Sequence, residues 1–185
     1  MRVTDIWLVR HGEAAAAFDQ NADPPLSDLG REQAMESAEW LSQCVPDGAN
    51  LLTSPKLRAI QTGEPFAGLR ERVLDIDRRF IELPSPRELS ERKEWIQRVL
   101  KGRWSELPES VNDWQRDIVE AIQGLEAPTV VFSHFLVINT VAAHMSGEDD
   151  VLQCLPANGS VHHLRVDGER WHWIERGEML QTVVN

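Results

Sequence analysis

Two histidines and two arginines lie directly after short apolar segments of this chain, far apart in the sequence. Arg10 and His11 follow one such segment, and His134 follows another. Arg58 lies just beyond Ser54, where a third apolar segment has ended. In an open α/β sheet, ligands bind where the carboxyl ends of parallel strands meet, so we expect these side chains to converge there. Guanidinium groups around an imidazole predict a binding site for a phosphate-like anion, in which the imidazole can act as a nucleophile.

Each residue type suits one part of phosphoryl transfer. A planar guanidinium binds two oxygens at once and stays charged, which predicts that Arg10 and Arg58 clamp a phosphate group. A neutral imidazole nitrogen is available near neutral pH, so His11 can attack phosphorus and form a covalent phosphohistidine. His134 is expected to bind the same phosphate and to donate a hydrogen bond to the transferring group.

These motifs, in this order, resemble those of the histidine phosphatase superfamily, which includes the cofactor-dependent phosphoglycerate mutases and many small phosphatases. The resemblance implies a phosphoglycerate mutase-like α/β fold, a three-layer α/β/α sandwich with a mostly parallel central sheet. It also places the nucleophile in the first motif, at His11. The matching segments are residues 10–13, 25–34, 54–62 and 133–134, with weaker matches at Glu82 and residues 158–161.

A leaving alkoxide needs a proton, so a carboxyl group should stand near the arginines. The resemblance assigns this role to Glu82, although the glycine and tryptophan that often follow it in the family are absent here. Glu13, which is close to the nucleophile in sequence, is the alternative. The sequence favours Glu82 and leaves the choice open.

The chain departs from the mutases at two places. The mutases follow their second active-site histidine with glycine and asparagine, whereas this chain has Phe135 and Leu136. They also carry an asparagine a few residues beyond the first histidine, where Ala17 stands here and Asn21 is a nearby substitute. Both changes concern the substrate set of a mutase and leave the phosphoryl centre intact.

We therefore predict a metal-independent phosphatase that hydrolyses phosphomonoesters, or phosphohistidine, through a phosphohistidine intermediate on His11. The alternatives are phosphoglycerate mutase-type phosphoryl transfer and a non-catalytic phosphate-binding scaffold. The expected partner is a small phosphorylated substrate or a phosphoprotein, with its identity and the oligomeric state left open. No cofactor and no metal are expected, because the adjacent His162 and His163 point to opposite faces of a strand and the other histidines lack ligand spacing.

Composition is that of an ordinary globular protein. The 185 residues are 42% hydrophobic and 26% charged, which predicts one domain over residues 1–185. The net charge of −11 argues against a surface that binds nucleic acid. The positive potential that a phosphate needs must therefore be confined to one cleft.

No membrane helix or signal sequence is apparent. Cys44 and Cys154 are expected to be reduced and buried, which favours a cytoplasmic protein, although a disulfide stays open.

The predicted active-site residues require strands and helices to position them. Continuous apolar runs predict buried strands, and apolar residues at helical spacing predict helices. We expect a long loop at residues 14–25 beside the site, and a helical cover at about residues 84–107. The helix that carries Arg58 is expected to begin at Pro55, with Ser54 as its N-cap. The predicted strands are residues 3–9, 49–53, 73–76 and 129–132 with a hairpin at 161–174, and the predicted helices include residues 28–45, 89–100, 111–125 and 135–145.

Overall fold

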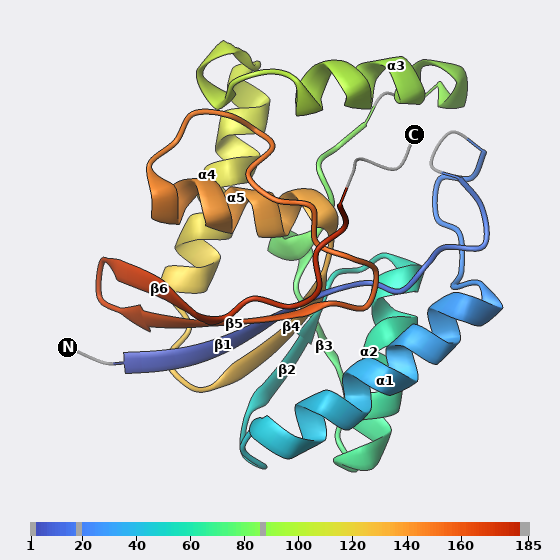
Figure 1. The fold of residues 1–185 in the computed structure, drawn as a ribbon, viewed down its shortest axis with the longest axis vertical. Coiled ribbons are helices and arrows are strands. Elements are labelled where there is room, and N and C mark those ends of the chain that lie inside the picture. Colours follow the sequence, from blue (N-terminus) through green and yellow to red (C-terminus); the bar gives the residue numbers. More distant parts are fainter. Residues whose placement is uncertain (1–2, 18–19, 86–87, 182–185) are drawn as a thin grey trace.

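The computed structural model describes residues 3–17, 20–85 and 88–181. Within these residues, six strands form one sheet in the order β3-β2-β4-β1-β5-β6, with helices on both faces (Figure 1). Neighbouring strands are parallel from β3 through β2 and β4 to β1. Strand β5 is antiparallel to β1 and forms an antiparallel hairpin with β6 at one edge of the sheet. The prediction of an α/β sandwich with a mostly parallel sheet is confirmed.

The elements follow the predicted order along the chain. The strands are β1 (Val3–Arg10), β2 (Asn50–Thr53), β3 (Asp75–Ile76), β4 (Thr129–Ser133), β5 (Val161–Asp167) and β6 (Arg170–Glu175). The helices are α1 (Asp28–Cys44), α2 (Leu57–Leu69), α3 (Leu89–Leu100), α4 (Glu109–Gln123) and α5 (Phe135–Ser146), with short 3-10 turns η1 (Arg78–Phe80) and η2 (Trp104–Glu106).

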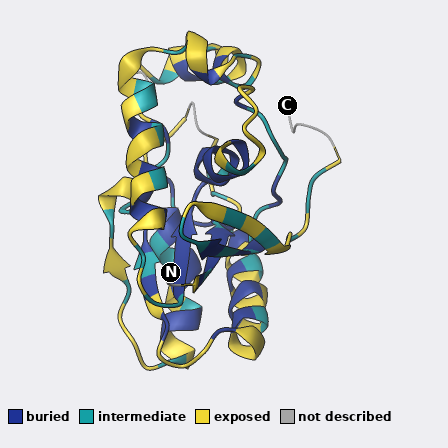
Figure 2. Ribbon diagram, turned by 90° about the vertical axis from the view of Figure 1, so that its left-hand side faces the viewer, coloured by how far each residue is buried: buried dark blue, intermediate teal, exposed yellow. Residues whose placement is uncertain are grey.

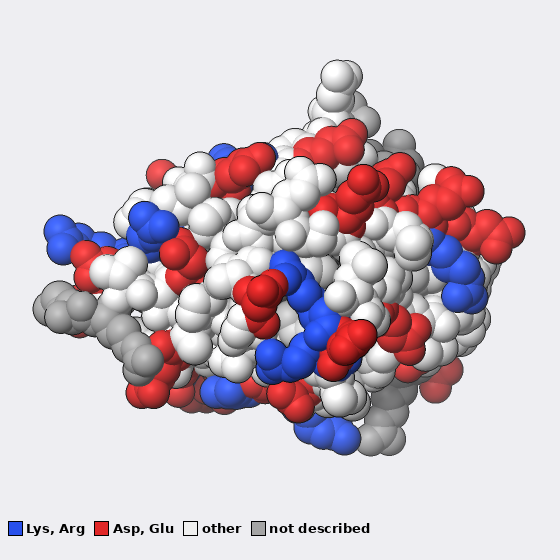
Figure 3. Space-filling view, turned by 90° about the horizontal axis from the view of Figure 1, so that it is seen from below, with Lys and Arg blue, Asp and Glu red and all other residues white. Residues whose placement is uncertain are grey.

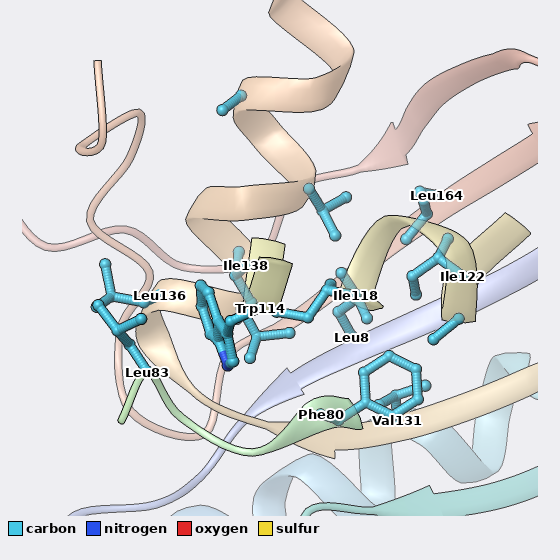
Figure 4. Close-up of a cluster of buried hydrophobic side chains, with 14 of the residues drawn as sticks. Leu8, Phe80, Leu83, Trp114, Ile118, Ile122, Val131, Leu136, Ile138 and Leu164 are labelled. Carbon is cyan, nitrogen blue, oxygen red and sulfur yellow. The ribbon is translucent and has the colours of Figure 1, made fainter. Parts of the chain in front are cut away.

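Two hydrophobic clusters cover the two faces of the sheet, because successive side chains of a strand point in opposite directions. Along β1, Ile6 and Leu8 enter the cluster that α4 and α5 cover, and Trp7 and Val9 enter the cluster under α1 and α2. Figure 4 shows the first cluster, where Leu8 of the sheet lies among side chains of α4 and α5. Helix α5 is buried along most of its length (Figure 2), which explains its nearly continuous apolar sequence.

The carboxyl ends of β2, β4 and β1 lie side by side. Arg10 pairs with Ser133 in the β1–β4 register, and Thr53 pairs with Phe132 in the β2–β4 register. Each strand is therefore followed, at the same edge of the sheet, by a segment that the sequence singled out. This register brings together residues that are more than a hundred positions apart in the chain.

The start of α2 differs from the prediction. The helix begins at Leu57 rather than Pro55, and its N-cap residue, Lys56, makes no capping bond with its side chain. Ser54 is not the N-cap residue. Its buried hydroxyl accepts the Lys56 N–H, which precedes the helix, and lies 2.6 Å from a ring nitrogen of His134. The Asp23 carboxylate, from the loop before α1, accepts a hydrogen bond from the Leu57 N–H over 3.0 Å instead. A distant loop thus supplies the cap.

The cysteines also differ from the prediction. Cys44 is exposed and Cys154 is partly exposed, and neither forms a disulfide. Cys44 is exposed because it occupies the last turn of α1, away from the apolar face that packs on the sheet. Helix α3 and turn η2 fall within the predicted cover at residues 84–107.

Acidic and basic side chains are mixed over the surface seen from below in Figure 3. None of the helices in the described part of the chain combines the length and the apolar character that crossing a membrane requires.

Candidate active site

The turn after β1 is built on two glycines in close contact. A Cβ on Gly12 would lie 2.3 Å from the carbonyl oxygen of Gly30, which is a distance that real Cβ atoms do not show. The Gly12 N–H donates to the hydroxyl of Thr62 on α2 over 3.0 Å, and that hydroxyl donates to the Arg58 carbonyl over 2.7 Å. The turn that presents His11 is thereby fixed against both α1 and α2.

The ring of His11 is held with one nitrogen free of protons. Its Nδ1 lies 2.7 Å from the carbonyl oxygen of Gly12, so in the neutral ring Nδ1 carries the hydrogen and donates it. The other nitrogen, Nε2, accepts a hydrogen bond from Nε of Arg58 over 3.0 Å. Burial, followed by the charges of Arg58 and Arg10, lowers the pKa of His11 well below its usual value. The result is a neutral imidazole whose Nε2 lone pair faces a cation.

Arg10 is oriented by contacts on two sides. Its Nη1 donates to the carbonyl oxygen of Pro156 over 2.6 Å, and its guanidinium carbon lies 5.1 Å from the centroid of the Phe135 ring. Burial lowers the pKa of Arg10 to about 10, which still leaves the group charged at neutral pH, and the nearby Glu82 carboxyl acts in the opposite direction. Its buried Nε has no partner among the described residues. That orphaned donor is suited to an anion.

Arg58 lies on the first turn of α2 with its side chain buried. Besides the bond to His11, its Nη1 lies 3.9 Å from the Asp23 carboxylate. Burial lowers the pKa of Arg58, whereas the charges of Glu82 and Asp23 raise it. The second predicted arginine therefore reaches the first histidine, as the convergence of strand ends requires.

His134 is the N-cap residue of α5 and is completely buried. Its ring meets the ring of His11 edge to face, with 5.3 Å between centroids. Nε2 lies 2.6 Å from the Ser54 hydroxyl, and Nδ1 is buried without a partner in the described part of the structure. Burial lowers the pKa of His134 well below its usual value, and His11 and the surrounding cations add to this effect.

The segment that carries Glu82 is fixed from both sides. The indole N–H of Trp114, on α4, donates to the Ile81 carbonyl over 3.0 Å, and the side chains of Phe80 and Leu83 are buried in the core. These anchors leave the Glu82 side chain directed at the carboxyl edge of the sheet, where it interacts electrostatically with Arg10 and Arg58.

The two candidate acids have different environments. The Glu82 carboxyl accepts backbone N–H groups of Leu83 at 3.0 Å and Leu136 at 3.4 Å. Burial nevertheless raises the pKa of Glu82, against the opposing effect of these bonds and the arginines. Glu13 is exposed, and its carboxylate accepts a 2.7 Å hydrogen bond from Ser27 at the start of α1. Glu82 is the carboxyl group that the fold places among the buried cations.

The structure adds residues to the site that the sequence analysis did not assign to it. The Asn158 side chain donates to the His11 carbonyl over 3.1 Å, and Thr62, Ser54 and Asp23 make the contacts described above. Asn158 lies in one of the weaker matching segments, and Thr62 follows Arg58 by one helical turn, so both carried a signal. Ser54 also lies in a matching segment, although its contact with His134 was not predicted, and Asp23 carried no signal.

Other predicted candidates lie outside the site. Asn21 is exposed, and its side chain accepts the N–H of Asp23 within the loop. His162 bonds to Ser160, and His163 bonds to Asp5, so the two adjacent histidines serve different partners. The described residues contain no group of three or more His, Cys, Asp or Glu side chains that could hold a metal ion.

Residues 6–178 match the sequence model of a family described as "Histidine phosphatase superfamily (branch 1)". No curated protein matches the chain. Solved structures do match over nearly the whole chain. Bacillus stearothermophilus YhfR is 25% identical, with a TM-score of 0.73, 92% of this chain and 95% of that chain covered.

Two further structures are similar in fold. The phosphoserine phosphatase of Entamoeba histolytica, solved with 3-phosphoglyceric acid, is 17% identical with a TM-score of 0.75, and the match covers 95% of this chain and 98% of that chain. A mycobacterial glucosyl-3-phosphoglycerate phosphatase is 20% identical with a TM-score of 0.70, and the match covers 94% of this chain and 98% of that chain.

Proposed function

Since the chain belongs to branch 1 of the histidine phosphatase superfamily, we propose that it hydrolyses phosphomonoesters without a metal ion, through a phosphohistidine on His11. The observation that carries this proposal is the state of the His11 ring. Its Nδ1 bonds to a backbone carbonyl, so the lone pair on Nε2 is the nucleophile, and it is already in contact with the guanidinium of Arg58.

In the first step, a phosphomonoester binds between the two guanidinium groups. Arg58 exchanges its bond to the neutral His11 nitrogen for stronger bonds to anionic phosphoryl oxygens, which frees the Nε2 lone pair. Nε2 attacks phosphorus, the bond from phosphorus to the ester oxygen breaks, and Glu82 gives its proton to that leaving oxygen. The raised pKa of Glu82 supports this role, because the carboxyl must be protonated when the alcohol departs.

In the second step, water attacks the phosphohistidine. The Glu82 carboxylate accepts a proton from the water, the bond between phosphorus and Nε2 breaks, and inorganic phosphate and the neutral ring of His11 are restored. Throughout both steps, Arg10, Arg58 and His134 stabilise the charge on the phosphoryl oxygens. The unpartnered Nε of Arg10 and Nδ1 of His134 supply donors for it.

A phosphatase fits this chain better than a mutase. The Phe135 ring, at a position where the mutases have glycine, lies against the guanidinium of Arg10. The two comparison structures that are named as phosphatases of small phosphorylated compounds support hydrolysis as the reaction class. We further propose one domain over residues 1–185 and a reducing compartment such as the cytoplasm, which suits the two free cysteines.

The test is hydrolysis of p-nitrophenyl phosphate by the wild-type protein, His11→Ala and His172→Ala. His172 is an exposed histidine on β6, so its variant controls for the loss of an imidazole. We expect His11→Ala to lose all measurable turnover and His172→Ala to keep the wild-type rate. A labelled substrate should leave a protein-bound label that survives a basic quench and is lost in acid, because phosphohistidine is acid-labile. A wild-type rate in His11→Ala would contradict the mechanism, and an inactive wild-type protein would favour the scaffold.

A further inference from the structure

The hydroxyl of Ser54 forms hydrogen bonds with two partners. The residue follows β2 and is completely buried. Its Oγ lies 2.6 Å from Nε2 of His134 and accepts the N–H of Lys56 over 3.3 Å. A hydroxyl has one proton and two lone pairs. Because Lys56 takes up a lone pair, the proton of the hydroxyl stays available for the ring of His134.

The opposite nitrogen of the same ring, Nδ1, has no such partner in the described part of the chain. Nδ1 of His134 is buried and has no partner among the described residues, although buried polar atoms are paired as a rule. The ring is packed edge to face against His11, with 5.3 Å between centroids. A phosphoryl group on His11 would therefore be the natural partner of Nδ1, provided that this nitrogen carries the proton.

We propose that Ser54 is a positioning residue that donates its O–H to Nε2 of His134 and thereby keeps the ring proton on Nδ1, where it binds a phosphoryl oxygen. This inference rests on the proposed function. A neutral imidazole has one N–H and one lone pair, so the partner of Nε2 decides what Nδ1 presents. With the proton on Nε2 instead, Nδ1 would direct a lone pair at an anion and repel it. The ring is neutral because burial and nearby cations lower the pKa of His134, so the tautomer determines its function.

The tautomer can be measured without any substrate. Long-range ¹H–¹⁵N NMR distinguishes a protonated ring nitrogen from one with a lone pair, and the His134 signals are assigned by their loss in His134→Asn. We expect Nδ1 to be protonated in the wild-type protein and this form to decrease in Ser54→Ala. Thr140→Val is the matched control, because it removes another completely buried hydroxyl, on the helix that begins after His134, that has no partner among the described residues. A wild-type ring protonated on Nε2, or a ring unchanged in Ser54→Ala, would overturn the proposal.

Kinetics test the consequence of this arrangement. Ser54→Ala should lower kcat by on the order of tenfold with little change in KM, the size expected for one neutral hydrogen bond, whereas Thr140→Val should match the wild type. Ser54→Thr retains a hydroxyl and should recover most of the lost activity. Normal kcat in Ser54→Ala, or no recovery in a folded Ser54→Thr, would contradict the role. If the wild-type protein hydrolyses no phosphate ester, the proposed function fails, while the NMR measurement still decides the role of Ser54.

Discussion

Two imidazoles and two guanidinium groups share a buried space at one end of the sheet. Water does not screen these groups well there, so each arginine opposes the appearance of a positive charge on His11 or His134. The same charges stabilise an incoming anion. Burial of the His11 ring is the largest cause of its lowered pKa, and the charges of Arg58 and Arg10, the proposed anion-binding groups, add to it.

The titration of His11 gives a direct prediction. Its pKa is lowered in the fold, so the ring should stay neutral as the pH falls through 6.5, the usual value for histidine, and charge only at a clearly lower pH. Arg58→Gln removes one of the charges that lower this pKa, and the midpoint should move upward. Ring proton resonances followed by NMR as a function of pH measure both values. A wild-type midpoint at or above 6.5 would show that the arginines do not control the ring.

Arg58→Gln should also lower kcat by roughly 10²–10³-fold relative to the wild-type protein, which is typical for the loss of one preorganised charged donor. The matched control is Arg116→Gln, because Arg116 is an exposed arginine on α4 whose side chain pairs with Asp113 in its own helix. A change of less than threefold in Arg58→Gln would remove this arginine from the proposed phosphate clamp.

The leaving group distinguishes the two candidate acids. If Glu82 protonates the departing oxygen, Glu82→Gln should slow alkyl phosphates by about 10²-fold and p-nitrophenyl phosphate far less, because nitrophenolate departs without a proton. Glu13→Gln should slow both substrates alike or not at all. Steady-state rates of both variants on both substrates measure this. A leaving-group dependence in Glu13→Gln, with equal losses in Glu82→Gln, would assign the acid role to Glu13.

At the scale of single residues, the sequence could predict the site residues that lie next to a recognisable strand. Arg10, His11 and His134 are adjacent to apolar strands, and this adjacency survives folding because a strand end has a fixed place in the sheet. The partner of Arg10, the Pro156 carbonyl, lies 146 positions away and is a backbone group, so no residue type announces it. Asp23 resembles any loop aspartate until the fold brings it to α2.

The elements that meet at the glycine turn are packed without spare room. Gly12→Ala should destabilise the protein by about 2 kcal/mol or more, because the new Cβ would meet the backbone of Gly30 rather than a side chain that can move. Gly48→Ala is the control, since a Cβ there meets nothing within 4 Å. Urea unfolding of both variants gives the difference in free energy. Equal stability in the two variants would mean that the turn can relax.

The N-terminus of α2 provides a second prediction at this scale. Asp23→Ala removes the carboxylate that accepts the Leu57 N–H and lies near Arg58, and it should cost about 1 kcal/mol, the usual effect of losing a helix cap. Asp23→Asn keeps an acceptor and should cost less. Asp113→Ala, which removes an exposed carboxylate on α4, serves as the control in the same urea titrations. A stability loss no larger than that of the control would contradict the capping role.

The extents of strands and helices could be predicted where burial alone determines their sequence. Strands β1 and β4 and helix α5 are nearly continuous apolar runs, since both faces of the sheet and all sides of α5 are covered. The start of α2 could not be predicted, because Ser54 and Pro55 are a favourable helix start by themselves. In the structure the helix begins later, at Leu57, where the Asp23 carboxylate from a distant loop accepts the first N–H.

At the scale of the whole molecule, the charges are divided between the surface and the site. The chain carries a net charge of −11, while Arg10 and Arg58 are held inside. In the proposed mechanism, these arginines take the place of a metal ion in neutralising phosphoryl oxygens. We therefore expect dialysis against EDTA to leave kcat within about twofold of the untreated protein. Activity that is lost on chelation and restored by a divalent cation would contradict the metal-independent mechanism.

Strand β1 lies in the interior of the sheet, between β4 and β5, although it is the first element of the chain. During synthesis on the ribosome, its partners at residues 129–133 and 161–167 are made long after it. The apolar strand must wait unpaired for them, and contacts between such distant segments form slowly. The surroundings of His11, the proposed nucleophile, are therefore completed only after Asn158 and β5 have emerged, and until then β1 lacks at least one of its partner strands.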